Sequence, residues 1–333
     1  MTKKINSHII GLGYYAPKNI IDNTYFSKFM DTSDKWIQER TGIQERRFAD
    51  KGQGPSDIAI PAVEMALKDA NLSVNDIDFI IFSTSTPDYY IPGSGCLIQE
   101  KMNFPNIGAL DIRCACTGFI YALSIADQYI KTKTYHNILV ITSEVQSTSM
   151  DLSNTGRDTA IIFADGAAAA VLSGNFNGEG ILSTHLHTQG KYAKELWVES
   201  PSSAMSPKLD KSIIKSGKHF LKMNGKEVFK HAVKRFPEVI IEALNYNDLN
   251  IDDINLLVPH QANIRISKMV QKKLGLNDNQ IFSNIHKYGN TTSASIPIAL
   301  CEAINNKQLN KGDILILAAF GSGFSWASAI LRW

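Results

Sequence analysis

The chain matches itself at a long, nearly constant spacing. Residues 62–86 (AVEMALKDANLSVNDIDFIIFSTST) and 239–263 (VIIEALNYNDLNIDDINLLVPHQAN) both have the pattern of an amphipathic helix, a polar turn and a buried strand. Their turns align at an offset of 177 residues (253 − 76), and NILVITS at 137–143 matches DILILAA at 313–319 at an offset of 176 (313 − 137). Such spacing indicates that one helix–turn–strand plan is used twice.

The repeated plan predicts an α/β protein. Apolar strands bounded by helices are typical of parallel sheets covered on both faces. We predict two similar halves, residues 1–172 and 173–333, packed as a layered α/β/α/β/α body, with the polar stretch 198–219 as a surface loop or insertion. An active site is expected where loops of the two halves meet. Chance similarity between helix–strand pairs is the alternative that the sequence alone leaves open.

Composition limits the classes of function. The 333 residues carry a net charge of +2, which argues weakly against nucleic acid as the main partner. The longest apolar runs, such as ILILAAF at 314–320, are too short to span a membrane, and the first residues lack the apolar stretch of a signal peptide. We therefore expect a cytoplasmic protein without a membrane partner. Its four cysteines are too few for a disulfide scaffold.

Two of the cysteines, Cys114 and Cys116, stand one residue apart in DIRCACTGFIYAL at 111–123. Metal binding is not expected, because no second Cys or His pair has zinc spacing. A buried strand is predicted at 107–112 and a helix at 117–131, so Cys116 would precede the helix, where backbone N–H groups lower a thiol pKa. Cys114 is expected to be an inert buried thiol. For Cys116, core residue and nucleophile both remain open.

Three later segments favour the nucleophile. A cysteine that transfers acyl groups needs an imidazole and an oxyanion hole. His260 ends a buried strand in LLVPHQANIRI, Asn290 precedes a small-residue helix in HKYGNTTSASIPIAL, and a Gly-rich turn lies in AAFGSGFSWAS at 318–328. Each has a plainer reading: a structural His, or an Asn that caps a helix. A dinucleotide fingerprint at GLGYYA (11–16) is not expected to bind, because Pro17 interrupts it.

Six motifs, in order along almost the whole chain, resemble those of 3-oxoacyl-[acyl-carrier-protein] synthase III, the initiating condensing enzyme of the thiolase superfamily. They are DTSDKWIQERTGIQERR (31–47), CTGFIYALSIADQYIK (116–131), AIIFADGAAAAVL (160–172), VPHQANIRI (258–266), YGNTTSAS (288–295) and FGSGFSWAS (320–328). The resemblance implies the duplicated thiolase-like fold and a homodimer. It also implies fatty acid biosynthesis, with acyl-CoA and malonyl-ACP (ACP, the acyl carrier protein) as substrates and no cofactor.

The resemblance implies roles for individual residues. Cys116 would attack an acyl-CoA thioester, with the backbone N–H groups of Cys116 and Ser322 forming the oxyanion hole. His260 and Asn290 would donate hydrogen bonds to the thioester carbonyl of malonyl-ACP as it loses CO₂. Ile91 would gate the acyl pocket from the dimer partner. Coenzyme A (CoA) would contact Thr32, Trp36, Arg40, Arg157, Gly225, Phe229 and Asn263, and ACP would contact Lys230, Lys234, Arg235, Arg265, Lys272 and Lys273.

The chain also departs from the family pattern. Arg113 and Cys114 replace the small residues usual before the nucleophile, and Ser322 stands where a glycine is common. Together with Ile91 and the 198–219 loop, these changes affect the prediction of the acyl primer and its chain length more than the prediction of the reaction. One alternative is a paralogous enzyme that uses longer chains or another acceptor in specialised metabolism. Another is a non-catalytic partner subunit with this fold, which has no need of Cys116, His260 and Asn290 together.

Overall fold

The structure is a computed structural model that describes residues 5–175 and 178–333. The strands are β1 (Asn6–Tyr15), β2 (Asn19–Asp22), β3 (Glu45–Phe48), β4 (Phe79–Ser83), β5 (Gly108–Ile112), β6 (Asn137–Glu144), β7 (Gly166–Asn175), β8 (Gly180–Thr188), β9 (Leu196–Trp197), β10 (Lys222–Met223), β11 (Leu256–Pro259), β12 (Ile314–Gly321) and β13 (Ser325–Arg332). The helices are α1 (Asp34–Thr41), α2 (Pro55–Ala70), α3 (Ser94–Lys101), α4 (Gly118–Lys131), α5 (Arg157–Ala160), α6 (Lys211–Lys215), α7 (Gly225–Tyr246), α8 (Ile264–Leu274), α9 (Ile285–Tyr288) and α10 (Ser295–Asn305).

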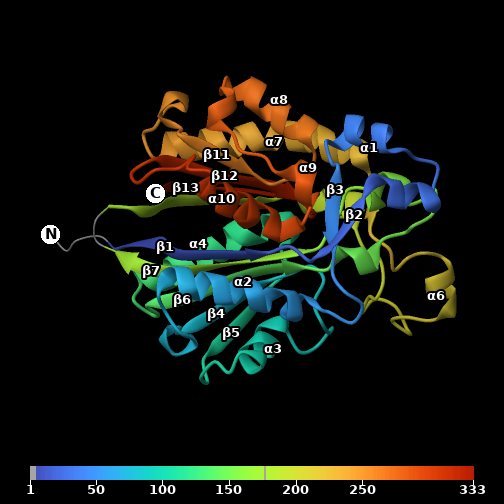
Figure 1. Ribbon diagram of the computed structural model, residues 1–333, viewed down its shortest axis with the longest axis horizontal. Coiled ribbons are helices and arrows are strands. Elements are labelled where there is room, and N and C mark those ends of the chain that lie inside the picture. Colours follow the sequence, from blue (N-terminus) through green and yellow to red (C-terminus); the bar gives the residue numbers. More distant parts are fainter. Residues whose placement is uncertain (1–4, 176–177) are drawn as a thin grey trace.

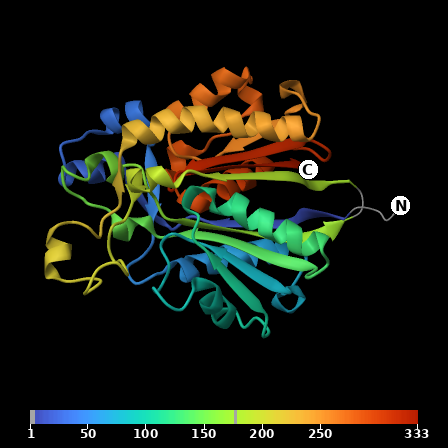
Figure 2. The ribbon, with the colours of Figure 1, turned by 180° about the vertical axis from the view of Figure 1, so that it is seen from behind.

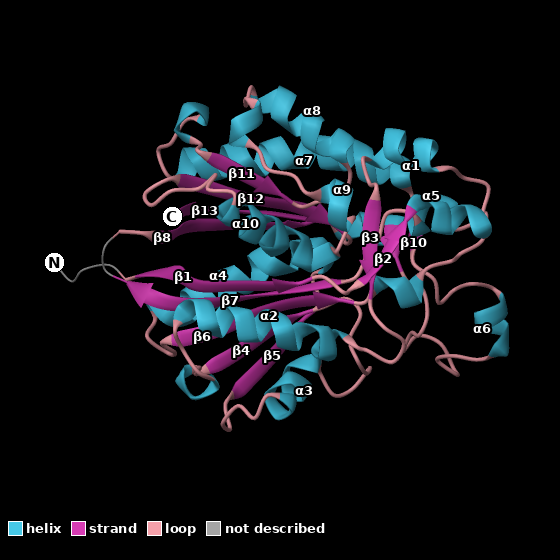
Figure 3. Ribbon diagram, viewed as in Figure 1, coloured by secondary structure: helices cyan, strands magenta, loops and turns pink. Residues whose placement is uncertain are grey.

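Two mixed sheets form the body of the molecule (Figure 3). One has the order β1-β7-β6-β4-β5 and the other the order β11-β12-β13-β8. Only β4–β5, β4–β6 and β11–β12 pair in parallel; the remaining neighbours in these two sheets are antiparallel. The prediction of parallel sheets was therefore wrong in part. Strands β12 and β13 are joined by three residues, which allows a hairpin but not a crossover to a parallel strand.

The layers alternate as the sequence predicted, α/β/α/β/α (Figures 1 and 2). Helices α2 and α3 cover the outer face of the five-stranded sheet, and α7 and α8 lie on the outer side of the four-stranded sheet. Helices α4 and α10 lie between the sheets and contact strands of both. Both central helices are apolar on most of their surface, as expected for helices buried on two sides.

The repeat has a structural basis at a single offset of 177 residues. Strand β6 begins at Asn137 and β12 at Ile314 (314 − 137), so the sequence alignment at 176 was one residue short. The turns before β4 and β11 are short 3₁₀ helices, η2 (Val74–Asp76) and η6 (Ile251–Asp253), each closed by a capping box. The box satisfies the free N–H groups at the start of each turn, which explains why this polar chemistry recurs.

The strands of the five-stranded sheet all come from residues 6–175, and those of the four-stranded sheet from residues 180–332. This partition supports a boundary near residue 172 but does not test it, so the division into two domains stays a proposal. The 198–219 stretch, expected to be a surface loop, runs between β9 and β10 and contains the short helix α6 (Figure 1). Within the described residues, no helix combines the length and apolarity needed to cross a membrane.

Candidate active site

Cys116 lies in a 3₁₀ turn, η3 (Ala115–Thr117), that leads directly into α4. The position before a helix is the one predicted, and the residue is only 3% exposed. Ala115 has φ of +45°, a left-handed conformation that costs non-glycine residues energy and is often found at functional sites. The Thr117 hydroxyl hydrogen-bonds to Ser325 Oγ at 3.0 Å, which ties this turn to the other half of the chain.

The end of β12 lies directly against Cys116. A Cβ atom placed on Gly321 would come within 2.6 Å of Cys116 Cβ and 3.0 Å of its Sγ, so only glycine permits this approach. Ser322 follows, and its backbone N–H and that of Cys116 both lie at the Cys116 sulfur and act to lower the pKa of its thiol. Ser322 Oγ donates to the carbonyl of Leu196 at 2.5 Å. The Gly-rich turn thus supplies N–H groups at the nucleophile, as an oxyanion hole requires.

The prediction of a lowered thiol pKa was wrong for the protein without substrate. Burial, followed by the charge of Glu144, raises the pKa of Cys116 to about 12, while the backbone N–H groups of Cys116 and Ser322 act in the opposite direction. Desolvation of the thiolate outweighs two hydrogen bonds, because the side chain has almost no contact with water. Cys116 therefore rests as a thiol.

His260 follows the last residue of β11 and is 2% exposed. Burial lowers the pKa of its imidazole to about 3, so the ring is neutral, as a hydrogen-bond donor to an enolate needs to be. Its Nδ1 lies 2.6 Å from Ser295 Oγ, which also accepts the N–H of Gln261 at 3.3 Å. Among residues 5–175 and 178–333, Nδ1 is the one acceptor for the Ser295 hydroxyl proton, which puts the imidazole proton on Nε2. That buried Nε2 has no partner within the described ranges.

The backbone of Asn290 pairs with that of Phe163 in a short parallel bridge. Its N–H donates to Ile162 O at 3.0 Å, and its carbonyl accepts from Ala164 N at 2.9 Å. Its side-chain Oδ1 accepts the N–H of Thr292 at 2.8 Å, which fixes the amide so that Nδ2 is the free end. Asn290 therefore presents a donor. It does not cap α10 itself, which begins at Ser295, but its Oδ1 accepts the first N–H of the 3₁₀ turn at Thr292–Ala294 that leads into α10, so a capping role and a donor role coexist.

A cavity of about 380 Å³ opens at Cys116. Its wall includes Phe163 and Thr292. Phe163 follows Ile162, whose carbonyl accepts the Asn290 N–H. Cys114 also lines the cavity, so this thiol is not the plain core residue that was predicted. Strand β5, predicted to be buried, forms the exposed edge of its sheet, since no further strand in the described ranges pairs with it.

A second cavity, of about 610 Å³, contains most of the residues predicted to bind CoA. Trp36, Arg40, Gly225, Phe229 and Asn263 all line it. Ile162 lines this 610 Å³ cavity, and the next residue, Phe163, lines the 380 Å³ cavity at Cys116, so the two cavities approach each other there.

The remaining CoA candidates lie beside Trp36. The guanidinium groups of Arg40 and Arg157 lie 4.6 and 4.8 Å from the centre of its ring, and Arg157 also donates to Asp31 O. An adenine stacked on Trp36 would share or displace one of these contacts. Thr32 has a buried hydroxyl with no partner in the described part of the chain. Asn263 caps α8 and donates to Arg40 O at 2.9 Å, so its side chain also organises the cavity wall.

The basic residues predicted to meet ACP differ in availability. Lys230 and Lys234 are 70% and 63% exposed at the side chain, each near a glutamate of α7. Arg265 lines the 610 Å³ cavity, and Lys272 and Lys273 lie in the last turn of α8. Arg235 instead packs its guanidinium 4.4 Å from the Trp326 ring and pairs with Glu238 at 2.7 Å. It is the least available of the six.

The sequence did not single out Glu144, the last residue of β6. Its carboxylate is fully buried and accepts hydrogen bonds from the hydroxyls of Ser85, Thr86 and Ser293 and from the Gln146 amide. Ser293 belongs to the turn η8 (Thr292–Ala294) between Asn290 and Ser295, so Glu144 joins the first half to the segment that carries these two residues. An acidic residue closing the apolar strand NILVITSE was the available signal. Among the described residues, no group of His, Cys, Asp and Glu is placed to hold a metal ion.

Comparison with known proteins identifies the family. Residues 110–190 match the family model 3-Oxoacyl-[acyl-carrier-protein (ACP)] synthase III, and residues 244–333 match the model of its C-terminal part. The chain is 43% identical to the beta-ketoacyl-[acyl-carrier-protein] synthase III of Clostridioides difficile (strain 630) over 98% of both chains. The chain belongs to the beta-ketoacyl-[acyl-carrier-protein] synthase III family. The synthase III of Caldanaerobacter subterraneus is also 43% identical, over 100% of this chain and 99% of that one.

Solved synthase III structures have the same fold. The crystal structure of 3-oxoacyl-[acyl-carrier-protein] synthase III from Aquifex aeolicus VF5 superposes with a TM-score of 0.90 at 39% identity, covering 98% of this chain and 100% of that chain. The predicted family, its thiolase-like layered fold and the class of condensing acyltransferase are confirmed. The individual site residues stay predictions, now supported by the geometry around Cys116.

Proposed function

We propose that this synthase III joins a short acyl-CoA primer to malonyl-ACP, giving 3-oxoacyl-ACP, CO₂ and CoA as the initiating step of fatty acid biosynthesis. One observation carries the proposal. His260 Nε2 is a buried donor without a partner in the described part of the protein, and Asn290 Nδ2 is the end of its amide that the bond from Thr292 leaves free. The backbone N–H of His260 donates to Ala318 O on β12, the strand whose end lies against Cys116, and Thr292, two residues after Asn290, lines the cavity of Cys116. A buried donor without a partner costs about 1–3 kcal/mol, which a substrate oxygen would recover.

In the first half-reaction, Cys116 Sγ attacks the thioester carbonyl of acyl-CoA. The N–H groups of Cys116 and Ser322, which already point at the sulfur, stabilise the oxyanion of the tetrahedral intermediate. The C–S bond to CoA then breaks, and the thiol proton leaves with the CoA sulfur. Because the resting thiol pKa is about 12, proton transfer and attack are coupled once the thioester fills the cavity.

In the second half-reaction, malonyl-ACP enters and loses CO₂. His260 Nε2 and Asn290 Nδ2 donate to the thioester oxygen, on which enolate charge develops, and the resulting carbanion attacks the acyl group on Cys116. Removing one such preorganised donor costs about 2.7–4 kcal/mol of transition-state stabilisation. Neither half-reaction requires a metal or cofactor, because the sulfur nucleophile and these donors supply the chemistry.

The proposal places CoA in the 610 Å³ cavity, with Trp36, Arg40, Arg157 and Thr32 at the nucleotide and Gly225, Phe229 and Asn263 along the pantetheine. Basic side chains at its rim, led by Arg265, would attract an acidic carrier protein. The other proposed carrier contacts are Lys230, Lys234, Arg235, Lys272 and Lys273.

We also propose a cytoplasmic homodimer. The exposed edge of β5 offers unpaired backbone groups that a second β5 could satisfy. In such a dimer Ile91, whose side chain is 81% exposed, would reach a partner's acyl pocket.

Intact mass spectrometry after incubation with acetyl-, butyryl- and hexanoyl-CoA tests the proposal. We expect a mass gain of one acyl group, absent in Cys116→Ala, that malonyl-ACP discharges as 3-oxoacyl-ACP. His260→Ala and Asn290→Ala should still be acylated but should not be discharged. No mass gain with any primer, or a gain that persists in Cys116→Ala, would refute the proposal.

A further inference from the structure

Arg113 stands three residues before the nucleophile and lines two adjoining cavities. One is the 380 Å³ cavity at Cys116; the other, of about 740 Å³, lies beside it. The two share Ser85, Thr86, Arg113, Ser149 and Val198 on their walls, so space continues from the nucleophile past Arg113. The 610 Å³ cavity proposed for CoA has none of these residues on its wall.

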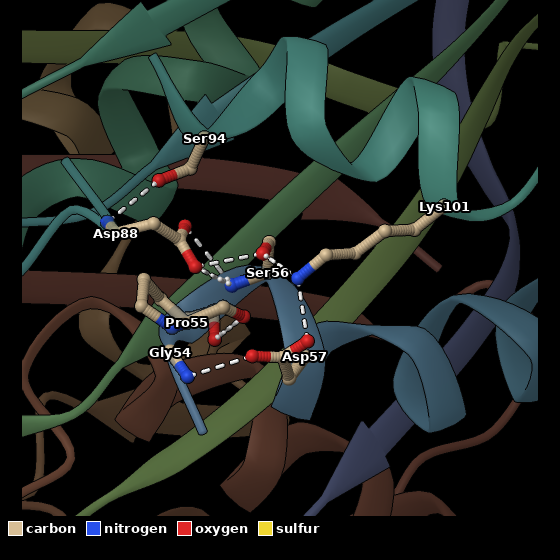
Figure 4. Close-up of polar contacts among 8 residues, drawn as sticks. Gly54, Pro55, Ser56, Asp57, Asp88, Ser94 and Lys101 are labelled. Carbon is tan, nitrogen blue, oxygen red and sulfur yellow. Dashed lines mark hydrogen bonds and ion pairs between the residues drawn. The ribbon is translucent and has the colours of Figure 1, made fainter. Parts of the chain in front are cut away.

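The other charges around this space are already satisfied within the protein (Figure 4). Lys101 Nζ contacts Asp57 Oδ1 at 2.5 Å and Ser56 Oγ at 2.7 Å. Asp88 accepts from the Ser56 hydroxyl at 2.7 Å and from its backbone N–H. These three charged side chains line the 740 Å³ cavity, but Asp88 holds the loop after β4 on the start of α2, and the Lys101–Asp57 pair ties the end of α3 to the same helix.

Arg113, by contrast, is free. Its guanidinium forms no hydrogen bond or ion pair with any residue in the ranges 5–175 and 178–333. The nearby Asp111 does not neutralise it through a contact, because its two oxygens accept the N–H groups of Ser94 and Gly95 at 2.6 and 2.8 Å. Among the described residues, Arg113 is also the one positively charged side chain on the wall of the Cys116 cavity.

The rest of that wall is amphipathic. Leu196, Val198 and Leu221 offer an apolar side suited to methylene groups, whereas Ser149 adds a hydroxyl on the side of Arg113 that the two cavities share. Ser85 and Thr86 lie on the same side, but their hydroxyls donate to Glu144, which leaves Arg113 as the cation that faces this space. A purely aliphatic acyl chain would leave this side unused. A chain with a few methylene groups and an anionic end would use both.

We propose that Arg113 selects acyl-CoA primers whose chain ends in a carboxylate, short ω-carboxyacyl thioesters such as succinyl- and glutaryl-CoA. The proposal rests on the proposed function, because the carboxyacyl group is the one transferred to Cys116. The sulfur forms a bond to the thioester carbon, the bond from that carbon to CoA sulfur breaks, and the thiol proton leaves on CoA. The distal carboxylate remains unchanged and pairs with the guanidinium.

The guanidinium suits this role because its planar fork can bind both oxygens of a carboxylate, while an ammonium cannot match that geometry. A hydrogen bond between charged groups is stronger than one between neutral groups, and a matched neutral primer would forfeit it. We therefore expect a preference of about tenfold or more for the charged primer over a branched primer of the same shape.

The experiment measures the rate of Cys116 acylation by intact mass spectrometry. Glutaryl-CoA is compared with its neutral isostere 5-methylhexanoyl-CoA, and succinyl-CoA with 4-methylpentanoyl-CoA. The wild-type protein should favour the charged member of each pair about tenfold or more. Arg113→Gln should lose that preference while its rate with the neutral isosteres stays within about twofold, and Arg113→Lys should keep only part of it.

Lys208→Gln is the matched control. Its ammonium lies 4.2 Å from the ring of Tyr90 beside the same space but does not line either cavity, so this variant should keep the wild-type preference. Acylation by neutral primers alone would overturn the inference and leave the proposed function standing, whereas no acylation by any primer would overturn both. The inference also fails if Arg113→Gln slows only discharge by malonyl-ACP, because Arg113 would then serve the malonyl carboxylate.

Discussion

Ser295 sets which nitrogen of His260 carries the proton, and its replacement should separate the two half-reactions. In Ser295→Ala, Nδ1 loses the hydroxyl that donates to it at 2.6 Å, so the imidazole proton is no longer held on Nε2. The ring stays buried and its pKa, about 3 in the wild type, stays low, so an imidazolium cannot restore the missing donor at neutral pH.

The magnitude follows from the donor that is lost. Complete loss of one enolate donor costs about 2.7–4 kcal/mol, or about 10²–10³-fold in the rate of condensation. Acylation of Cys116 uses the N–H groups of Cys116 and Ser322 instead, so its rate should stay within about threefold of wild type. The Gln261 N–H also loses an acceptor, which should lower the free energy of unfolding by about 1 kcal/mol.

The assay is a single turnover in two stages. Acylation by butyryl-CoA is followed by intact mass, and the isolated butyryl-enzyme is then mixed with malonyl-ACP while release of CO₂ is recorded. Ser328→Ala is a matched control, because Ser328 is equally buried and its hydroxyl donates to Val239 O at 2.9 Å, away from His260. Condensation at the wild-type rate in Ser295→Ala, or an equal fall in both stages, would refute the tautomer assignment.

Three further outcomes follow from the same site. Because the pKa of the Cys116 thiol is raised to about 12, the thiolate fraction is small at neutral pH, and the rate of alkylation by iodoacetamide should keep rising from pH 7 to 10; a plateau near pH 7 would contradict this. Gly321→Ala should slow acylation at least about 100-fold in the same mass assay, since its Cβ would lie 2.6 Å from Cys116 Cβ; near-normal acylation would show that β12 moves freely. Glu144→Gln removes a negative charge near the thiol, so the apparent pKa from alkylation should fall, whereas Ser293→Ala, which keeps that charge, should leave it unchanged.

The sequence predicted those parts of the molecule that local patterns encode. The capping boxes at Ser73–Asp76 and Asn250–Asp253 recur because each must close the same turn before a buried strand, and that chemistry is visible in four residues. The direction of β7 and β13 was not visible, since apolar runs look alike in parallel and antiparallel sheets. The pKa of Cys116 depends on burial, to which residues more than 150 positions away contribute. The position of Cys116 at the start of a helix therefore predicted the wrong direction for the pKa shift.

Glu144 and Ser295 escaped for a related reason: each acts through a partner in a distant segment, Ser293 and His260 respectively. A single acidic residue at a strand end, or one serine among four small residues, has no distinctive spacing. Cys116, by contrast, opens the long motif 116–131, whose residues are contiguous, so the sequence alone was enough to single it out as the candidate nucleophile.

The internal repeat explains how the halves divide the chemistry. At the offset of 177, the turn η3 corresponds to η8, and their first residues, Ala115 and Thr292, both have positive φ. Cys116 then corresponds to Ser293, and Gly321 to Glu144. In one half the proposed nucleophile faces a glycine that lets β12 lie directly against it; in the other the equivalent serine donates to a carboxylate at 2.8 Å.

The second pair of equivalent positions follows the same logic. Ser83 corresponds to His260, and Gly118 to Ser295. A Cβ on Gly118 would lie 2.0 Å from Ser83 Oγ, so the first half has no room there for a side-chain pair, while the second holds the imidazole and its hydroxyl 2.6 Å apart. The groups proposed for acyl transfer and for enolate binding thus occupy equivalent places in the two halves, and at each place the equivalent residues of the other half have a different, non-catalytic arrangement.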